Sequence, residues 1–171
     1  FFSDELAVEL AETSETSVAS VLHLSGMAIH QGATPDERIQ VNRIDVLGIA
    51  SDFWSFTEGF SADLGPNETA LNQKLAMALD VEVGDEISMR VAKPSLMSRD
   101  APLSWSGEDR SKRRRYTVKH IVPDEHLGRF SLSPSQIAPY NAFVNRDWLQ
   151  DQVELEKGVN LLLVGENTSE N

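Results

Sequence analysis

The chain has 171 residues, a formal net charge of -12, no cysteine and 40% hydrophobic residues. This length fits one domain and this apolar content is enough for a core, so wholesale disorder is excluded. The lack of cysteine excludes disulfides, thiolate metal ligands and a cysteine nucleophile, and the acidic balance argues against a nucleic-acid binder because phosphate contacts require clustered Lys and Arg.

The first predicted elements are a helix and a long β-hairpin. Ser3 suits the N-cap of a helix over residues 4–12, because its hydroxyl can accept a first-turn N–H. Residues 18–29 and 39–49 are rich in aliphatic and β-branched side chains, and the Gly- and Pro-containing segment between them indicates a turn. We expect the first of these strands to bend at Ser25-Gly26, since a glycine inside a strand pattern often marks a bulge.

Shorter elements are expected in the middle of the chain. The aromatic-rich segment 51–60 fits a loop or short helix that covers one end of a sheet. Asn72 suits the N-cap of a helix that ends at Leu79. Residues 81–85 read as a turn, and residues 86–92 alternate between apolar and polar side chains, which predicts a half-buried strand.

The second half of the chain begins with an irregular segment. Residues 93–115 contain two prolines, a glycine and several serines, and they predict a long loop. A strand is expected to resume at Tyr116. A short helix over 147–155 and a last strand over 159–164 follow, and residues 165–171 are interpreted as a frayed tail.

This order of elements favours an α+β fold, with a mixed or antiparallel β-sheet, a long hairpin and a few short packing helices, because the sequence lacks regular βαβ alternation. We expect one domain over residues 1–171. No stretch approaches the roughly 18 apolar residues that a membrane-spanning helix needs. The chain opens with Phe1-Phe2 and no start methionine, which we interpret as a fragment of a longer protein.

The sequence shows no motif for catalysis, phosphate binding or metal binding. Its four histidines have no metal-ligand spacing, and the segment 104–107 lacks the first glycine of a nucleophile elbow. The acids near residues 80–86 are interpreted as solvated turn carboxylates. A hydrolase that uses His120 or His126 lacks any nucleophile–base spacing. We therefore expect no enzyme activity, no cofactor and no metal.

A basic run is the strongest local charge anomaly. Between Arg99 and His120 there are seven Lys or Arg against three Asp or Glu, a net +4 within an acidic chain. One interpretation is a contact patch for an anionic lipid surface or an acidic partner; the other is a solvated surface loop. The predicted partner-contact residues are Trp105, Lys112, Arg113, Arg114 and Arg115.

Several short strings, taken in order, resemble one family. They are Phe1-Phe2-Ser3-Asp4-Glu5-Leu6-Ala7, Val46-Leu47-Gly48-Ile49 followed by Asp52-Phe53-Trp54, Asn72-Gln73-Lys74-Leu75-Ala76, Val83-Gly84-Asp85-Glu86-Ile87, Gly128-Arg129-Phe130-Ser131-Leu132, Asn141-Ala142-Phe143-Val144 and Asn160-Leu161-Leu162. The ordered set is similar to the FtsX-like ABC transporter permeases with a MacB-like periplasmic core domain.

The resemblance implies a non-catalytic extracytoplasmic domain that transmits ATP-driven motion and contacts partners or substrate during transport. It implies a membrane helix just upstream of Phe1 and a location on the periplasmic side of the bacterial inner membrane. The implied partners are the transmembrane remainder of the permease, a cytosolic ABC ATPase subunit and a periplasmic adaptor or lipoprotein, with no nucleic acid. Such permeases serve efflux, lipoprotein release or control of envelope enzymes.

One alternative from another class stays open. A free-standing module for a peptide, sugar or lipid would need an exposed aromatic platform. The candidates for that platform are the aromatic residues of segment 53–60 and Trp105 in the irregular segment. Of these we expect Phe53 and Trp54 to pack in the core and Trp105 to be exposed.

Overall fold

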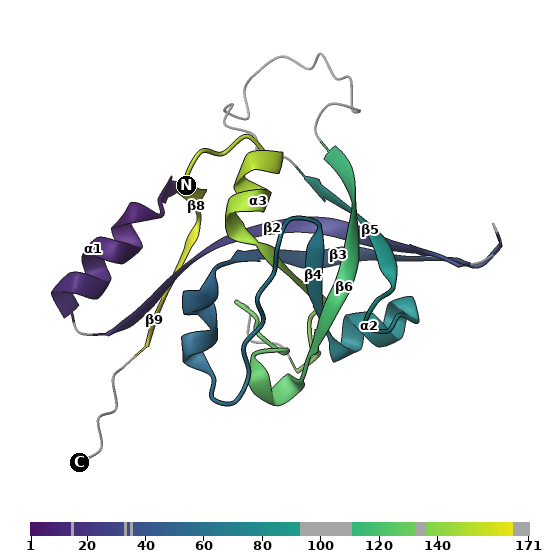
Figure 1. Cartoon of the computed structure of the whole chain (residues 1–171), viewed down its shortest axis with the longest axis horizontal. Helices are drawn as coiled ribbons and strands as arrows, with labels where there is room; N and C mark the ends of the chain where they lie inside the picture. Colours follow the sequence, from purple (N-terminus) through teal and green to yellow (C-terminus); the bar gives the residue numbers. More distant parts are fainter. Residues whose placement is uncertain (15, 33, 35, 93–110, 133–135, 166–171) are drawn as a thin grey trace.

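The computed structural model describes residues 1–14, 16–32, 34, 36–92, 111–132 and 136–165. The helices are α1 (Glu5–Ser14), α2 (Gln73–Leu79), α3 (Arg146–Gln152) and the short 3-10 helices η1 (Ser51–Phe56) and η2 (Asp124–His126). The strands are β1 (Phe2–Ser3), β2 (Ser17–Gln31), β3 (Arg38–Ile49), β4 (Glu68–Asn72), β5 (Glu86–Ala92), β6 (Ser111–Val122), β7 (Asn141–Asn145), β8 (Gly158–Val159) and β9 (Leu161–Gly165). The predicted α+β class is confirmed (Figure 1).

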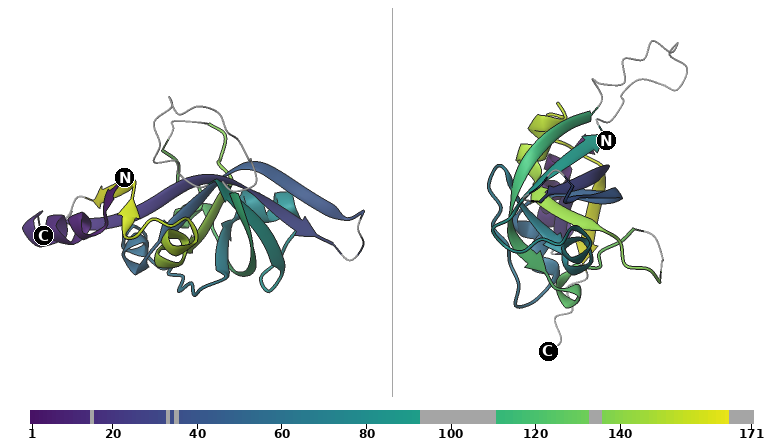
Figure 2. Two further views of the ribbon diagram at one scale, coloured as in Figure 1. Left: turned by 90° about the horizontal axis from the view of Figure 1, so that it is seen from above. Right: turned by 90° about the vertical axis from the view of Figure 1, so that its right-hand side faces the viewer.

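Six strands pair in a circuit that closes on itself. The order is β3-β7-β4-β6-β5-β2, and β2 pairs again with β3. The β3–β7 and β4–β6 pairs are parallel and the other pairs are antiparallel, so the sheet is mixed, as predicted. The sheet curls round on itself (Figure 2), while β9 extends it along the first half of β2. A separate two-stranded sheet joins β1 to β8.

The predicted hairpin is formed by β2 and β3, and its tip points away from α1 (Figure 1). The register shifts between Gly26 and Met27, as the sequence predicted for this position. Gly26 pairs with Ile44 and Met27 pairs with Asn42, so the extra residue of the bulge is Arg43, which has a positive φ of 57°. A Cβ on Gly26 would lie 2.5 Å from the Arg90 carbonyl oxygen, and glycine therefore lets β5 approach β2.

Alternate residues of the strands divide into two buried clusters. On β3, Val46 belongs to the cluster covered by α2 and α3, whereas Leu47 belongs to the cluster covered by η1. Phe53 and Trp54 of η1 are buried in the second cluster, and their rings lie 5.1 Å apart in an edge-to-face arrangement. The expected packing role of these two aromatics is confirmed, because both rings are buried and neither is available as an exposed binding platform.

Local sequence explains the ends of α2. The Asn72 side chain accepts a hydrogen bond from the Leu75 N–H at 3.0 Å, which confirms the predicted N-cap. Asp80 ends the helix in the left-handed conformation. The following Val83-Gly84-Asp85 turn has Gly84 at a φ of 102°, a conformation that favours glycine.

Three sequence-based expectations are corrected. Residues 111–115 belong to β6 and not to the irregular loop, since the strand begins at Ser111; residues 93–110 lie outside the described residues. The expected last strand is broken into β8 and β9 at Asn160, whose side chain bonds the His23 N–H and carbonyl and replaces the ladder there. Gly165 is part of β9 and not of the tail, whose residues 166–171 also lie outside the described part.

Among the described residues, no helix has the length and apolar character needed to cross a membrane.

Candidate functional site

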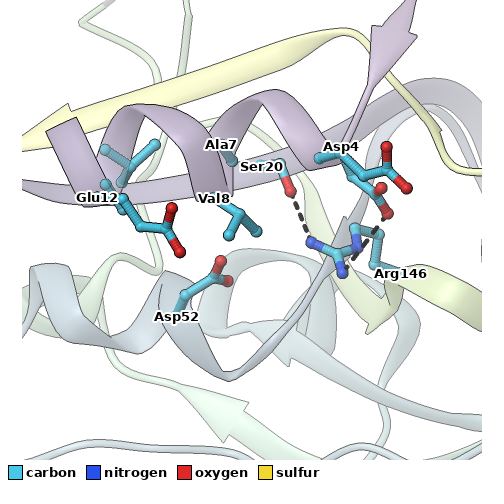
Figure 3. A pocket seen from close by; sticks show the side chains of 10 residues that line it. Asp4, Ala7, Val8, Glu12, Ser20, Asp52 and Arg146 are labelled. Carbon is cyan, nitrogen blue, oxygen red and sulfur yellow. Dashed lines mark hydrogen bonds and ion pairs between the residues drawn. The ribbon is translucent and has the colours of Figure 1, made fainter.

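The start of α1 is attached to the body through Arg146, the first residue of α3. The guanidinium Nη1 donates to the Ser20 Oγ at 2.6 Å, and Nη2 lies 3.8 Å from the Asp4 Oδ2 (Figure 3). Its Nε donates to Asp147 at 3.3 Å. The Arg146 side chain is only 17% exposed, so it links α1, β2 and α3 at one partly buried point. Sequence analysis did not indicate this role, because Ser20 and Asp4 lie more than a hundred residues from Arg146 in the chain.

A second attachment joins α1 to the segment before β8. The Asp4 N–H donates to the Lys157 carbonyl at 2.9 Å, and Phe2 of β1 pairs with Val159 of β8. Lys157 Nζ lies 2.7 Å from Glu5 Oε1. This ion pair lowers the pKa of Glu5 and raises the pKa of Lys157. Both side chains are well exposed, so the pair adds little stability, and the backbone bonds carry most of this attachment.

A cleft of about 510 Å³ lies beneath α1 (Figure 3). Its walls include Val8, Val18, Asp52 and Arg146. Of the residues on α1, Ala7 is buried, whereas the apolar side chains of Leu6, Val8 and Leu10 are exposed. The helix therefore rests on the body through a few polar contacts at its start, with little apolar packing along its length.

Asp52 of η1 is the unusual acid of this cleft. Its Oδ1 atom is buried and has no hydrogen-bond partner in the described structure. Burial raises the pKa of Asp52, and the charge of Arg146 opposes that shift in part. The neighbouring Ser20 hydroxyl accepts a hydrogen bond from Arg146. The polar groups of the cleft thus fit an anchoring role for α1.

We expect Asp52→Asn to stabilise the chain at neutral pH. A carboxyl whose pKa is raised by folding binds more protons in the folded state, so its contribution to the free energy of unfolding falls as pH rises above the ordinary aspartate value of about 3.9. The variant should therefore gain stability over the wild type near pH 7 and match it near pH 3, as measured by urea unfolding across about pH 3–7. Asp124→Asn, an exposed acid, is the control; a pH-independent gain for Asp52→Asn contradicts the assignment.

The structure separates the predicted partner-contact residues. Arg113 and Arg115 are exposed on the outer face of β6, while Arg114 points to the other face and donates through Nε to Gln152 of α3 at 2.6 Å. Arg113 is paired across the strands with Arg90 of β5, which sequence reasoning missed. Trp105 lies outside the described residues, as does the side chain of Lys112.

The histidines make separate polar contacts, but His120 and His126 both lie against the ring of Phe60. His23 Nε2 lies 2.9 Å from Asp45 Oδ1, and His30 Nδ1 donates to the Leu79 carbonyl at 2.9 Å. His126 lies 3.0 Å from the Thr57 hydroxyl and stacks on Phe60. Within the described ranges, no group of three or more His, Asp or Glu side chains is arranged to hold a metal ion.

Part of the acidic turn at residues 80–86 is held in place by hydrogen bonds. The Asp85 Oδ2 accepts a hydrogen bond from the Glu82 N–H at 2.9 Å, and the Asp85 carbonyl accepts from the Val118 N–H at 2.8 Å. The Gly84 N–H donates to the Val118 carbonyl at 2.7 Å. These bonds tie the turn to β6 and agree with the interpretation of Asp85 as a turn residue.

The fold has a counterpart among solved structures. No family model matches the chain, and no curated protein gives a significant sequence match. The chain is similar to the crystal structure of the periplasmic region of MacB from Actinobacillus actinomycetemcomitans, with 12% identity and a TM-score of 0.59. The similarity covers 100% of this chain and 67% of that chain. At this identity the likeness establishes a MacB-like fold.

Proposed function

We propose that this chain is a non-catalytic extracytoplasmic domain of an ABC transporter permease of the FtsX-like class. The observation that carries the proposal is the MacB-like fold over the whole chain, and the ordered strings in the sequence agree with it. In this proposal, ATP is hydrolysed by a separate cytosolic subunit. The conformational change of that subunit is transmitted through the transmembrane helices, and the domain then moves as a rigid body.

The connections of α1 support this role. The elements β1, α1 and β9 lie at the same end of the molecule (Figure 1). Motion that enters through α1 passes to the closed ring of strands through Arg146 and through the β1–β8 pair.

The proposal includes location and partners. The domain spans residues 1–171 and lies on the periplasmic side of the bacterial inner membrane. Its partners are the transmembrane remainder of the permease, the ATPase subunit and a periplasmic adaptor or lipoprotein, in a system for efflux or lipoprotein release. A free-standing binding module has less support, because Phe53 and Trp54 lie in the core.

The test uses the native gene product. We expect the full-length protein to stay in the membrane fraction after an alkaline carbonate wash, to need detergent for release and to co-purify with an ATPase subunit. The wash separates an integral protein from a peripheral one. Recovery of the native product from the aqueous fraction, as a chain of about the length of one domain, would refute the proposal.

A further inference from the structure

The outer face of β5 and β6 carries a cluster of three exposed arginines, which we call the arginine patch: Arg90, Arg113 and Arg115. Arg90 and Arg113 are register partners on adjacent antiparallel strands. Side chains at such positions have Cβ atoms about 4.5–5.5 Å apart, and like charges directly opposite each other destabilise a sheet. Arg115 is two residues along the same face, opposite Ser88.

No carboxylate in the described part of the chain forms an ion pair with the arginine patch. Within the described ranges, Arg113 donates to the Ser88 hydroxyl at 3.4 Å. Glu86 shares this face of β5 but forms no ion pair with the patch, and the next cation, Lys119, pairs with Glu68 at 2.9 Å. In a chain of net charge -12, acids are abundant, yet the described ones leave this repulsion without compensation.

We propose that the arginine patch binds an acidic segment of a partner protein. Each guanidinium can hold a carboxylate through two parallel N–H···O bonds, and a partner carboxylate between Arg90 and Arg113 would replace their repulsion by attraction. This inference deepens the proposed function by naming the chemistry of a partner surface. It rests on the proposed function only for the assignment of the partner to a transport system.

A membrane surface fits the patch less well. Polybasic segments that bind anionic lipid usually carry about 4–8 Lys or Arg, and the net charge of -12 opposes approach to such a surface. The exposed large hydrophobic residues of the described chain, which would insert into lipid, lie on elements other than β5 and β6. They are Phe1, Leu6, Val8, Leu10, Met77, Val83, Leu132, Ile137 and Val164.

A second copy of the chain also fits less well. The acids that could meet the patch lie elsewhere, for example along the groove lined by Glu5, Asp147, Asp151 and Glu156. A contact between two different surfaces of the same protein is head-to-tail. Such contacts form a closed ring only for particular rotations between neighbouring copies, and otherwise they form an open filament. An acidic segment of another protein needs no such closure.

The test measures binding of a fluorescein-labelled oligoglutamate peptide to this chain by fluorescence anisotropy. We expect binding at about 10 mM ionic strength that weakens at about 150 mM, because the Debye length falls from about 30 Å to about 8 Å. The double variant Arg90→Ser, Arg113→Ser should bind roughly tenfold more weakly than the wild type. The matched control is Arg38→Ser, Arg114→Ser, which removes the same charge elsewhere and should keep the wild-type affinity.

Each other outcome counts against the proposal. Equal losses in both double variants would mean that net charge and not the patch drives binding. Patch-dependent binding to phosphatidylglycerol vesicles without peptide binding would assign the patch to lipid, and patch-dependent self-association in sedimentation would assign it to a second copy. If circular dichroism shows that the double patch variant is misfolded, Arg113→Glu is used instead. This variant should lose binding to oligoglutamate and gain binding to oligolysine. The fractionation test above can fail while the peptide still binds, so the two proposals are distinguishable.

Discussion

Replacing Phe53 with alanine is expected to reduce the free energy of unfolding by about 3–5 kcal/mol. The Phe53 side chain has no exposed surface, and its ring lies 5.1 Å from Trp54, 5.8 Å from Phe130 and 5.6 Å from Phe143. Alanine would leave a cavity between η1 and the sheet and would remove these aromatic contacts. The loss is a large share of the roughly 5–15 kcal/mol that stabilises an ordinary domain.

Urea unfolding followed by tryptophan fluorescence measures this change, because Trp54 lies against the Phe53 ring. Phe1→Ala removes the same side chain from a site that is 56% exposed, and it should change the stability by no more than about 0.5 kcal/mol. If the two variants lose similar amounts, or if Phe53→Ala loses less than about 1 kcal/mol, then η1 does not pack on the sheet as described.

Local patterns were sufficient for the elements whose signal is periodic or depends on one residue. The hairpin of β2 and β3 followed from two aliphatic runs around a turn, and the α2 cap followed from Asn72. The bend at Gly26 was also predicted, but its extra residue, Arg43, is on the partner strand. A bulge is a property of a strand pair, so one strand's sequence indicates its position and not which strand holds the extra residue.

The start of β6 was missed because charge hid the alternation. Arg113 and Arg115 point outward. Arg114 is on the same side of the strand as the buried Tyr116, but it lies near the start of β6, where its side chain reaches Gln152. Three adjacent arginines show no alternation of apolar and polar residues, so the run was interpreted as part of a loop. Arg114 can still occupy the inward side, because its long side chain keeps the charged end in water. The two-residue strands β1 and β8 are too short to give any pattern.

The candidate site was less predictable than the fold, because it depends on contacts between distant parts of the chain. A helix over residues 4–12 was predicted, and Asp4 and Glu5 do lie at the start of α1. Their partners Arg146 and Lys157 come from the other end of the chain. The arginine patch likewise depends on the register between β5 and β6, which places Arg90 opposite Arg113.

A buried asparagine shows how one side chain can organise such distant segments. Asn72 has no exposed surface, and its Nδ2 donates to the carbonyls of Gly128 and Pro139 at 2.9 and 2.7 Å. Its Oδ1 accepts from the N–H groups of Leu75 and Asn141 at 3.0 and 3.2 Å. An amide offers two donors and two acceptor lone pairs. All four are used here, and they join the start of α2 to Gly128 and to the segment from Pro139 to Asn141.

Asn72→Ala is therefore expected to reduce the free energy of unfolding by about 3 kcal/mol or more. The helix loses its cap, worth about 1 kcal/mol, and buried carbonyl and N–H groups lose partners at about 1–3 kcal/mol for each group that stays unsatisfied. Asn72→Asp keeps the two acceptors but places a carboxylate against the carbonyls of Gly128 and Pro139, so we expect a similar loss at neutral pH. Protonation restores one donor, so Asn72→Asp should recover part of its stability relative to the wild type as pH falls, whereas Asn72→Ala should not.

Chemical unfolding of both variants at neutral and acidic pH measures these differences. Asn42→Ala is the control, because its side chain accepts from Gln40 at an exposed position of β3, and it should change stability by no more than about 0.5 kcal/mol. An Asn72→Ala variant as stable as this control would mean that the segments around Gly128 and Pro139 are held by other contacts. A pH-independent deficit in Asn72→Asp would mean that the loss comes from side-chain shape and not from opposed oxygen atoms, because only the latter responds to protonation.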